Sequence, residues 1–244
     1  SILKERKSGV LLHISSLPSS YGIGDLGEDA YKFVDFLQNS KQSYWQILPF
    51  TPPARENSPY RSFSAFAGNP LYIDLKDLVE KGWIDKADLR QTPDFSEKKV
   101  DYKTVQKFKE KIFKKAFTNF NEKAKKPEYN KFVKKNQYWI NDYSLFMALN
   151  KYFEGKPWNQ WPEDIASRKE EAIKKYKNKL KDEIEYHKFL QFVFDKQWQK
   201  LKRYANSRGI KIIGDVPIFV AHDSSYVWTN PELFKLNKKK EPSR

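Results

Sequence analysis

Three short apolar runs, separated by patterns typical of helices, most constrain what this chain can fold into. The runs cover residues 9–14, 44–48 and 210–215, and a proline follows each of them within four residues. Runs of this length bounded by turn residues are typical of strands buried on both faces. Residues 28–37, between the first two runs, carry one apolar helical stripe: Ala30, Phe33, Val34 and Leu37. A strand, helix, strand order predicts a parallel crossover and therefore an α/β fold.

The middle of the chain predicts a helical insertion between the second and third strands. From residue 76 to about residue 181, glycine nearly disappears and Lys, Glu, Phe and Tyr dominate. One predicted helical face collects six apolar side chains: Val105, Phe108, Ile112, Phe113, Ala116 and Phe117. Trp139, Trp158 and Trp161 are expected to pack the inserted helices together, since tryptophans are large core anchors.

A long amphipathic helix is expected from about Tyr186 until just before Gly209, a residue suited to a helix C-terminal cap. We therefore predict three parts. Residues 1–75 hold the first strands and a functional loop, residues 76–185 form the helical insertion, and residues 186–244 hold this helix and the third strand. Three or four strands in parallel connection are too few to close an eight-stranded barrel.

Composition excludes several classes of protein. The chain has 244 residues and no cysteine, which excludes a disulfide-stapled module. No run approaches the roughly 18 apolar residues of a membrane span, and no apolar signal segment opens the chain. The expected location is the cytoplasm. The net charge of +15 lies entirely beyond residue 100, as lysines spaced among acidic residues. This spacing favours a solvated helical surface over a nucleic-acid site, which typically uses arginine and clustered basic runs.

Several polar residues have competing interpretations from the sequence alone. Asp215 ends the third predicted strand, where it could serve an active site or cap nearby backbone N–H groups. Tyr60 could present its ring to a ligand or lie on a surface turn. His13 lies in an apolar strand, which favours an interior histidine over a substrate contact. The spacing of His222 and Asp223 relative to Asp215 fits no common zinc or calcium pattern.

Glycine and serine motifs do not support two other enzyme classes. Gly22, Gly24 and Gly27 have the spacing of a dinucleotide fingerprint, but no acidic ribose partner follows a second strand as that motif requires. A serine hydrolase is not supported either, because the chain has no G-x-S-x-G elbow.

Five sequence blocks, in order, resemble one known family. Residues 11–19, 21–27, 45–49, 57–71 and 209–228 resemble the 4-α-glucanotransferases, also called amylomaltases or disproportionating enzymes. The helix segment from Gln191 to Trp198 adds to the similarity, which spans nearly the whole chain.

This resemblance implies a (β/α)8 TIM barrel of the α-amylase type, about twice as long as this chain, that transfers α-1,4-glucan segments with retention. Retention requires two carboxyl groups about 5 to 5.5 Å apart. The resemblance implies that this pair comes from later strands, beyond residue 244. The chain would then be an N-terminal half that is inactive alone. The implied partners are α-1,4-glucans and maltooligosaccharides, with no cofactor, metal, nucleic acid or membrane.

The resemblance also implies site residues. Asp215 matches an active-site carboxylate, Tyr60 a sugar platform and Ser58 a contact to sugar hydroxyls. Tyr102 matches one aromatic of a remote glucan site in some members, although Arg55 replaces the other. A second departure, Tyr226 in place of the usual Asp, has no evident consequence. A non-catalytic α-glucan-binding module is the alternative function.

Overall fold

The computed structural model describes residues 6–52, 61–62, 64, 66–96, 99–214, 219–234, 236–237 and 239–242. Contacts divide the chain into two units. The first unit contains Ser1–Phe50, Asn69–Lys125 and Val193–Val216, and the second contains Thr51–Gly68, Lys126–Phe192 and Pro217–Arg244. The described part is mostly helical with a small parallel sheet, as the α/β prediction requires.

The sheet of the first unit has three parallel strands in the order β1-β2-β4. These strands, β1 (Gly9–Leu11), β2 (Tyr44–Gln46) and β4 (Lys211–Ile213), lie in the three predicted apolar runs. The register pairs Leu11 with Gln46 and Gln46 with Ile213. Each strand is shorter than its apolar run. After β1, a 3₁₀ turn (Ile14–Ser16) bends the chain out of the sheet.

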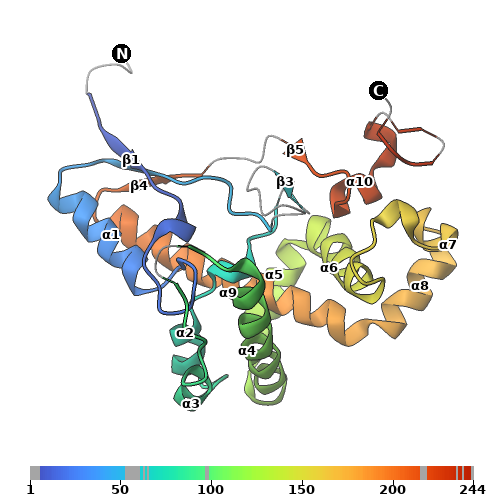
Figure 1. The fold of residues 1–244 in the computed structure, drawn as a ribbon, viewed down its shortest axis with the longest axis horizontal. Helices are drawn as coiled ribbons and strands as arrows, with labels where there is room; N and C mark the ends of the chain where they lie inside the picture. The colour runs from blue at the N-terminus through green and yellow to red at the C-terminus, as the bar shows by residue number, and fades with distance from the viewer. Residues whose placement is uncertain are drawn as a thin grey trace. The chain divides into compact units, whose positions relative to one another are not determined.

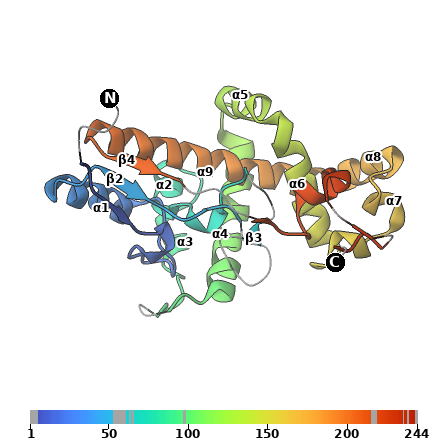
Figure 2. The same cartoon turned by 90° about the horizontal axis from the view of Figure 1, so that it is seen from above.

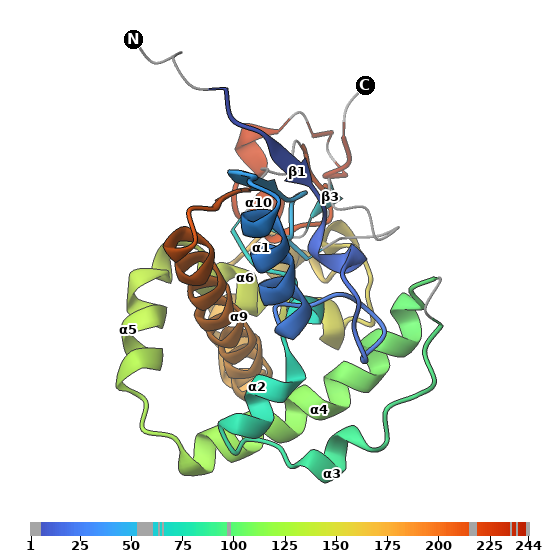
Figure 3. The same ribbon diagram turned by 90° about the vertical axis from the view of Figure 1, so that its left-hand side faces the viewer.

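Helices cover one face of this sheet (Figure 1). The predicted stripe of helix α1 (Glu28–Asn39) is confirmed, because Ala30, Val34 and Leu37 are fully buried. Phe33 of α1 packs edge-on against Trp45 of β2 at a ring-centroid distance of 4.9 Å. The C-terminal part of helix α9 (Lys181–Ser207) lies on the same side (Figure 3). Burial of this face holds the short strands in register.

Two loop glycines of the first unit have backbones that a side chain would disturb. Gly22 has a φ of +86°, and an added Cβ would lie 2.6 Å from Val105. A Cβ at Gly24 would lie 2.0 Å from the carbonyl oxygen of Ile14. The glycine-rich segment is therefore a tightly packed loop in which the chain approaches itself.

Three helices follow in the first unit: α2 (Leu75–Glu80), α3 (Lys86–Leu89) and α4 (Tyr102–Lys123). Asp74 caps α2 by accepting from the amide of Lys76, and Asp101 caps α4 by accepting from the amide of Thr104. The predicted apolar face of α4 is confirmed at five of its six positions: Val105, Phe108, Ile112, Phe113 and Ala116 are buried. Phe117 is half-buried.

The second unit combines a two-stranded parallel sheet with five helices of its own among the described residues. Strand β3 (Arg61–Ser62) pairs with β5 (Phe219–Val220). The helices are α5 (Pro127–Lys135), α6 (Gln137–Tyr152), α7 (Glu163–Ala166), α8 (Glu170–Lys179) and α10 (Ser225–Thr229). Short 3₁₀ turns lie at Pro70–Tyr72 in the first unit and at Trp158–Gln160 and Pro231–Leu233 in the second.

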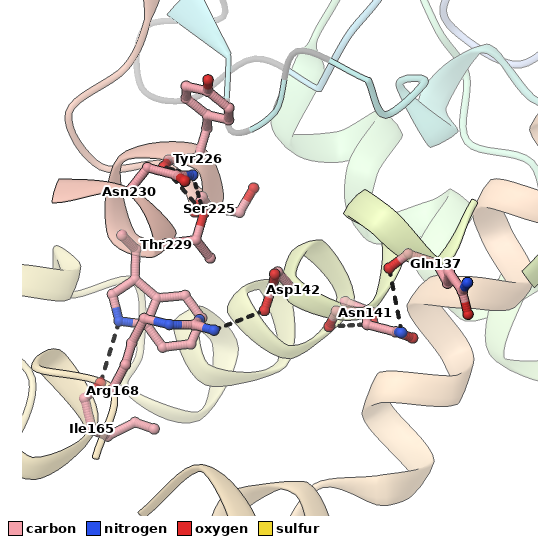
Figure 4. Close-up of polar contacts among 11 residues, drawn as sticks. Gln137, Asn141, Asp142, Ile165, Arg168, Ser225, Tyr226, Thr229 and Asn230 are labelled. Atoms are coloured by element: carbon pink, nitrogen blue, oxygen red, sulfur yellow. Dashed lines mark hydrogen bonds and ion pairs between the residues drawn. The ribbon is translucent and has the colours of Figure 1, made fainter. Parts of the chain in front are cut away.

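An aromatic core joins the helices of the second unit. Trp158 and Trp161 are almost fully buried in it, which confirms their predicted role, and Trp139 is also buried. Trp228 of α10 is fully buried and donates from its indole nitrogen to the carbonyl of Ile165 at 3.2 Å. The guanidinium carbon of Arg168 lies 4.4 Å from the centre of the Trp228 ring, and its Nη2 donates to Asp142 at 3.0 Å (Figure 4). This arrangement combines an ion pair with a cation–π contact.

Helix α9 contributes its first part to the second unit and its remainder to the first (Figure 2). It begins five residues before the predicted Tyr186 start. Gly209, just after the helix, has a φ of +73°, and the amide of Ile210 donates to the carbonyl of Ala205 at 2.9 Å. The predicted glycine cap is therefore confirmed. None of the helices in the described ranges is long and apolar enough to cross a membrane.

Candidate functional site

The carboxyl ends of the three parallel strands in the first unit lie at one level. The amide of Leu12 donates to Gln46, and the amide of Ile47 donates to Ile213, each at 3.0 Å, so the ladder continues one residue beyond the strands. The chain then leaves the sheet through His13 after β1 and Gly214 after β4. Functional side chains of parallel α/β proteins gather at this edge, which makes it the candidate site.

Three of the four predicted site residues lie outside the described residues: Asp215, Ser58 and Tyr60. Arg55, the departure noted beside them, lies outside as well. The backbone next to these segments is described. Arg61, directly after Tyr60, pairs with Phe219 in the β3–β5 ladder of the second unit. In the first unit, a Cβ at Gly214 would lie 4.0 Å from the ring of Phe50.

Tyr102, the fourth predicted residue, is the first residue of α4 and is half-buried. Tyr102 lies close enough to Tyr72 to affect the pKa of the Tyr72 hydroxyl. Burial raises the pKa of Tyr72 above its usual range, and the nearby Tyr102 adds to that shift. Tyr226 of the second unit packs edge-on against Phe234 at 6.1 Å, and its carbonyl accepts from the side chain of Asn230 at 3.0 Å (Figure 4).

His13 is held at the sheet edge by Tyr72. The Nε2 atom of His13 lies 2.9 Å from the Tyr72 hydroxyl, and the two rings meet edge-on at 5.5 Å. Burial lowers the pKa of His13 to about 4, so its imidazole is neutral at pH 7. Nδ1 is buried with no hydrogen-bond partner in the described structure. The predicted interior histidine is therefore half-buried, with one of its two nitrogens partnered.

Lys109 is the residue at this site that the sequence interpretation missed. It is fully buried on the inner face of α4. Its ammonium group donates to the carbonyl oxygens of Leu71 at 2.6 Å and Ile73 at 3.2 Å. Burial lowers its pKa to about 8, while the negative charges of Asp25 and Asp74 act in the opposite direction. Lys109 therefore fixes the 71–73 backbone with a cation that two carboxylates balance.

Asp25 holds the glycine-rich loop on the other side of this cation. Its carboxylate accepts from the amide of Gly27 at 2.9 Å and from the hydroxyl of Ser19 at 3.2 Å. Burial raises the pKa of Asp25 to about 6, and Lys109 opposes that rise. Burial likewise raises the pKa of Asp74. Hydrogen bonds of Lys109 and Asp25 thus fix two loops, and the charges of Lys109, Asp25 and Asp74 influence one another without a direct ion pair in the described structure.

The charge of Lys109 gives a prediction about stability in alkali. Its folded pKa of about 8 lies below the ordinary value of 10.5, so between these values the unfolded chain binds more protons than the folded chain. The free energy of unfolding should therefore rise from pH 8 to about pH 10. Tyrosines with raised pKa values titrate above this window. Urea unfolding at several pH values measures the rise, and the double variant Lys109→Met, Asp25→Asn should lack it. An equal rise in the double variant would contradict the assignment.

Two glutamines of α9 each clamp both backbone groups of one residue in the segment that follows β2. In the second unit, Gln191 accepts from the amide of Gly68 at 2.8 Å and donates to its carbonyl at 2.9 Å. In the first unit, Gln197 accepts from the amide of Asp74 at 2.7 Å and donates to its carbonyl at 3.1 Å. Gln197 also donates to Asp77 at 2.9 Å. Both side chains are buried, so these bonds are shielded from water.

Substituting Gln197 should show how much this clamp contributes to the free energy of unfolding. Gln197→Ala removes two hydrogen bonds from the partly buried backbone of Asp74, and we expect a loss of about 2 kcal/mol in the free energy of unfolding. Hydrogen exchange of the Asp74 amide should also accelerate. Gln199→Ala is the matched control on the same helix, since the side chain of Gln199 makes only a 3.4 Å hydrogen bond, to Asp195, among the described residues. Equal effects of the two variants would argue against the clamp.

Comparison with known proteins identifies the family. The family model described as 4-alpha-glucanotransferase matches residues 12–240. The 4-alpha-glucanotransferase of Clostridium butyricum is 50% identical over 229 residues, covering 93% of this chain and 47% of the relative. The corresponding protein of Thermus thermophilus is 44% identical over 241 residues, covering 98% of this chain and 47% of that relative. The chain thus spans about half the length of the curated relatives it matches.

Solved structures agree with this result. An amylomaltase from Streptococcus agalactiae, solved in complex with acarbose, matches with a TM-score of 0.94 and 43% identity, over 98% of this chain and 48% of that one. An amylomaltase from Corynebacterium glutamicum matches with a TM-score of 0.73 at 17% identity, over 93% of this chain and 32% of that one, which shows the fold alone. The resemblance seen in the sequence blocks is therefore confirmed, and this chain belongs to the 4-alpha-glucanotransferase family, glycoside hydrolase family 77.

Proposed function

We propose that this chain supplies the N-terminal half of a 4-α-glucanotransferase, an enzyme that moves α-1,4-glucan segments between maltooligosaccharides. The observation that carries the proposal is the match, over 98% of this chain, to an amylomaltase solved with acarbose. Acarbose is an oligosaccharide analogue, which supports α-glucans as ligands. The cysteine-free composition supports a cytoplasmic location.

In this proposal the three parallel strands belong to a (β/α)8 barrel of the α-amylase type. The division into residues 1–75, 76–185 and 186–244 then separates the first barrel strands, a helical insertion, and the helix and strand that follow. The parallel β1-β2-β4 order supports this arrangement, because consecutive barrel strands pair in parallel with helices between them. The shared level of the strand ends supports a site at their carboxyl edge.

The proposed reaction is a retaining double displacement. One carboxylate attacks the anomeric carbon while a second carboxyl group protonates the departing glycosidic oxygen. The hydroxyl of an acceptor glucan then displaces the carboxylate and loses its proton to the second group, which restores both. We place this pair in polypeptide beyond residue 244, so the chain alone should not release glucose from maltotriose.

Asp215, Tyr60 and Ser58 are proposed to hold the sugar at the cleaved bond. A carboxylate at the end of a barrel strand can accept from sugar hydroxyls and favour the positive charge that develops on the sugar ring. A tyrosine ring offers a flat apolar surface to sugar C–H groups, and its hydroxyl can still hydrogen-bond. Tyr102 is proposed as a contact to glucan outside the cleavage site. Its half-buried position leaves part of the ring exposed for such a contact.

A chimera tests this function. Residues 12–240 would replace the segment that they match in the Clostridium butyricum relative, with which the chain is 50% identical. The chimera should convert maltotriose to glucose and longer glucans. Asp215→Asn in the chimera should lower turnover at least about ten-fold, since it removes a charge that acts in the transition state. Asp94→Asn is the control outside the proposed site. A folded chimera without transfer activity, or equal effects of the two substitutions, would contradict the proposal.

A further inference from the structure

A groove in the first unit is lined by a set of lysines that none of the roles above uses. It lies between α4 and the segment 88–93, and its volume is about 670 Å³. That volume falls in the range of small-molecule sites. Four lysines of α4 line it together with Gln91 and Pro93 of the segment that follows α3. We call it the lysine groove.

The four lysines form a single row along α4. Lys103, Lys107, Lys111 and Lys115 recur every four residues, so each lies about one turn, roughly 6 Å, from the next. All four residues are exposed. Like charges at this spacing repel one another and slightly destabilise the helix. The row therefore concentrates positive potential along the groove at a small cost to the folded chain.

The two ends of the row differ in their partners. At one end, Lys115 contacts both oxygens of Asp88 at 2.8 Å and lies 3.5 Å from Asp85. Lys111, next to it, donates to the side-chain oxygen of Gln91 at 3.0 Å. At the other end, no carboxylate lies within ion-pair distance of Lys103 or Lys107 in the part of the chain that the structure describes. Among the described residues, the Lys103–Lys107 end of the groove therefore carries positive charge that no ion pair neutralises.

Asp101, an acidic residue beside this end, is already engaged. Asp101 accepts from the hydroxyl of Thr104 at 2.7 Å and from its amide at 3.2 Å, as the N-terminal cap of α4. Its charge attenuates that of Lys103 without an ion pair. The amide nitrogen of Gln91 stays available as a neutral donor, because Lys111 occupies only the oxygen of that side chain. Donors therefore face the groove from both of its walls.

The lysine groove is independent of Tyr102. Tyr102 is not among the residues that line the groove. The side chains of Lys103 and Lys107 leave α4 about 100° and about 140° around the helix axis from that of Tyr102. Lys109 shares the inner side with Tyr102 and points into the core. A ligand in the lysine groove would therefore not occupy the proposed glucan contact.

We propose that the Lys103–Lys107 end of this groove binds a phosphomonoester, either free phosphate or the phosphate group of a small sugar. A phosphomonoester carries about −1.5 to −2 charges at neutral pH and three strong acceptor oxygens. Two ammonium groups one turn apart can bracket it, and the Gln91 amide can donate from the opposite wall. Pro93 and Phe108, which also line the groove, add apolar surface beside the charge, suited to the C–H face of a sugar ring. This inference does not depend on the proposed transferase function.

Titration of the chain at low ionic strength tests the inference, with binding followed by calorimetry and by amide NMR shifts of residues 103–111. The probes are inorganic phosphate, glucose 1-phosphate, glucose 6-phosphate and glucose. Phosphate and the sugar phosphates should bind and shift these amides, whereas glucose should not. Equal affinities of phosphate and sugar phosphates would assign the site to the phosphate group alone. Tighter binding of a sugar phosphate than of phosphate would show that the apolar surface of Pro93 and Phe108 contacts the sugar as well. Absence of any phosphate binding, or binding of glucose equal to that of its phosphates, would overturn the inference.

Two double variants distinguish binding at this groove from the general attraction of phosphate to a basic protein. Lys103→Gln with Lys107→Gln should weaken phosphate binding at least about ten-fold, because two charge-assisted hydrogen bonds are lost. Lys131→Gln with Lys135→Gln on α5 is the matched control, since both residues are exposed, lie one turn apart and remove the same charge. Thermal melting checks that both variants fold. Equal weakening in the two double variants, or an acidic peptide that binds the groove where phosphate does not, would overturn the proposal.

Discussion

Replacing Lys109 with methionine is expected to lower the free energy of unfolding by about 3 kcal/mol at pH 8. Methionine keeps the length and apolar stem of the side chain but removes its positive charge. Among the described residues, Lys109 is the only cation that acts to lower the pKa of both Asp25 and Asp74. The carbonyls of Leu71 and Ile73 also lose a donor. Breaking a buried ionic network on one side is strongly destabilising because the remaining charges stay buried.

The loss should depend on pH with a defined sign. Without Lys109, the folded pKa of Asp25 should rise further above its present value of about 6, while the unfolded pKa stays near 3.8. The folded variant then binds more protons than the unfolded variant across that interval, so its stability falls as pH rises. The difference between wild type and variant should therefore be smaller at pH 5 than at pH 8. Urea unfolding followed by far-UV circular dichroism measures the free energy of unfolding of both proteins at each pH.

A second substitution distinguishes charge balance from simple loss of packing. Adding Asp25→Asn to Lys109→Met removes one unbalanced carboxylate and should recover part of the stability at pH 8. Asn can still accept from the amide of Gly27, which preserves the loop contact. If the double variant were less stable than the single variant at pH 8, charge balance could not be the function of Lys109.

Truncating Trp228 to alanine should cost about 4 kcal/mol, the loss expected for a large aromatic residue in a closed core. The side chain is fully buried and contacts the rings of Phe146 and Trp161 at centroid distances of 6.0 Å and 5.6 Å. Its removal also frees the Ile165 carbonyl and takes away the ring beneath Arg168. Urea unfolding measures the loss, and hydrogen exchange should place it in the second unit.

Trp228→Phe is the graded control for this prediction. Phenylalanine fills part of the volume and keeps a ring under Arg168, but it cannot donate to Ile165. Its cost should be clearly smaller, about 1 to 2 kcal/mol, as for a partly filled cavity with one lost hydrogen bond. A Trp228→Ala variant as stable as Trp228→Phe would mean that this side chain does not anchor the core.

The elements defined by hydrophobic periodicity could be predicted from the sequence. The parallel strands lie in the three apolar runs, and the buried face of α1 is the one that its stripe indicates. Strand ends were less predictable. The run at 9–14 reads as one strand, yet β1 ends at Leu11 and its last ladder hydrogen bond comes from the amide of Leu12, because local turn geometry at Ile14–Ser16 competes with the sheet. Periodicity reports burial, and the 3₁₀ turn buries Ile14 as a strand would.

The polar residues that organise the site were harder to predict. Lys109 lies four residues after Val105 and four before Phe113, on the predicted apolar face of α4. Its position on the apolar face was the one indication in the sequence that Lys109 is buried. Lysine is rarely fully buried, however, and is ordinarily assigned to the solvent-exposed surface. Gln191 and Gln197 stood in a family-like block without an assigned role. Their bonds go to backbone groups distant in sequence, which a local pattern does not specify.

The roles assigned to Asp215, Ser58 and Tyr60 remain predictions, since these residues lie outside the described part of the chain. What supports them is membership of the family from which these roles were inferred.

The buried position of Lys109 separates two properties of an amine that usually go together. With a pKa of about 8, a larger share of this amine is the free base, and hence nucleophilic, than is usual for a lysine. Full burial nevertheless withholds it from any electrophile in solution. Acylating reagents can therefore modify Lys109 only when α4 opens transiently. The rate at which Lys109 is acylated then reports how often α4 opens.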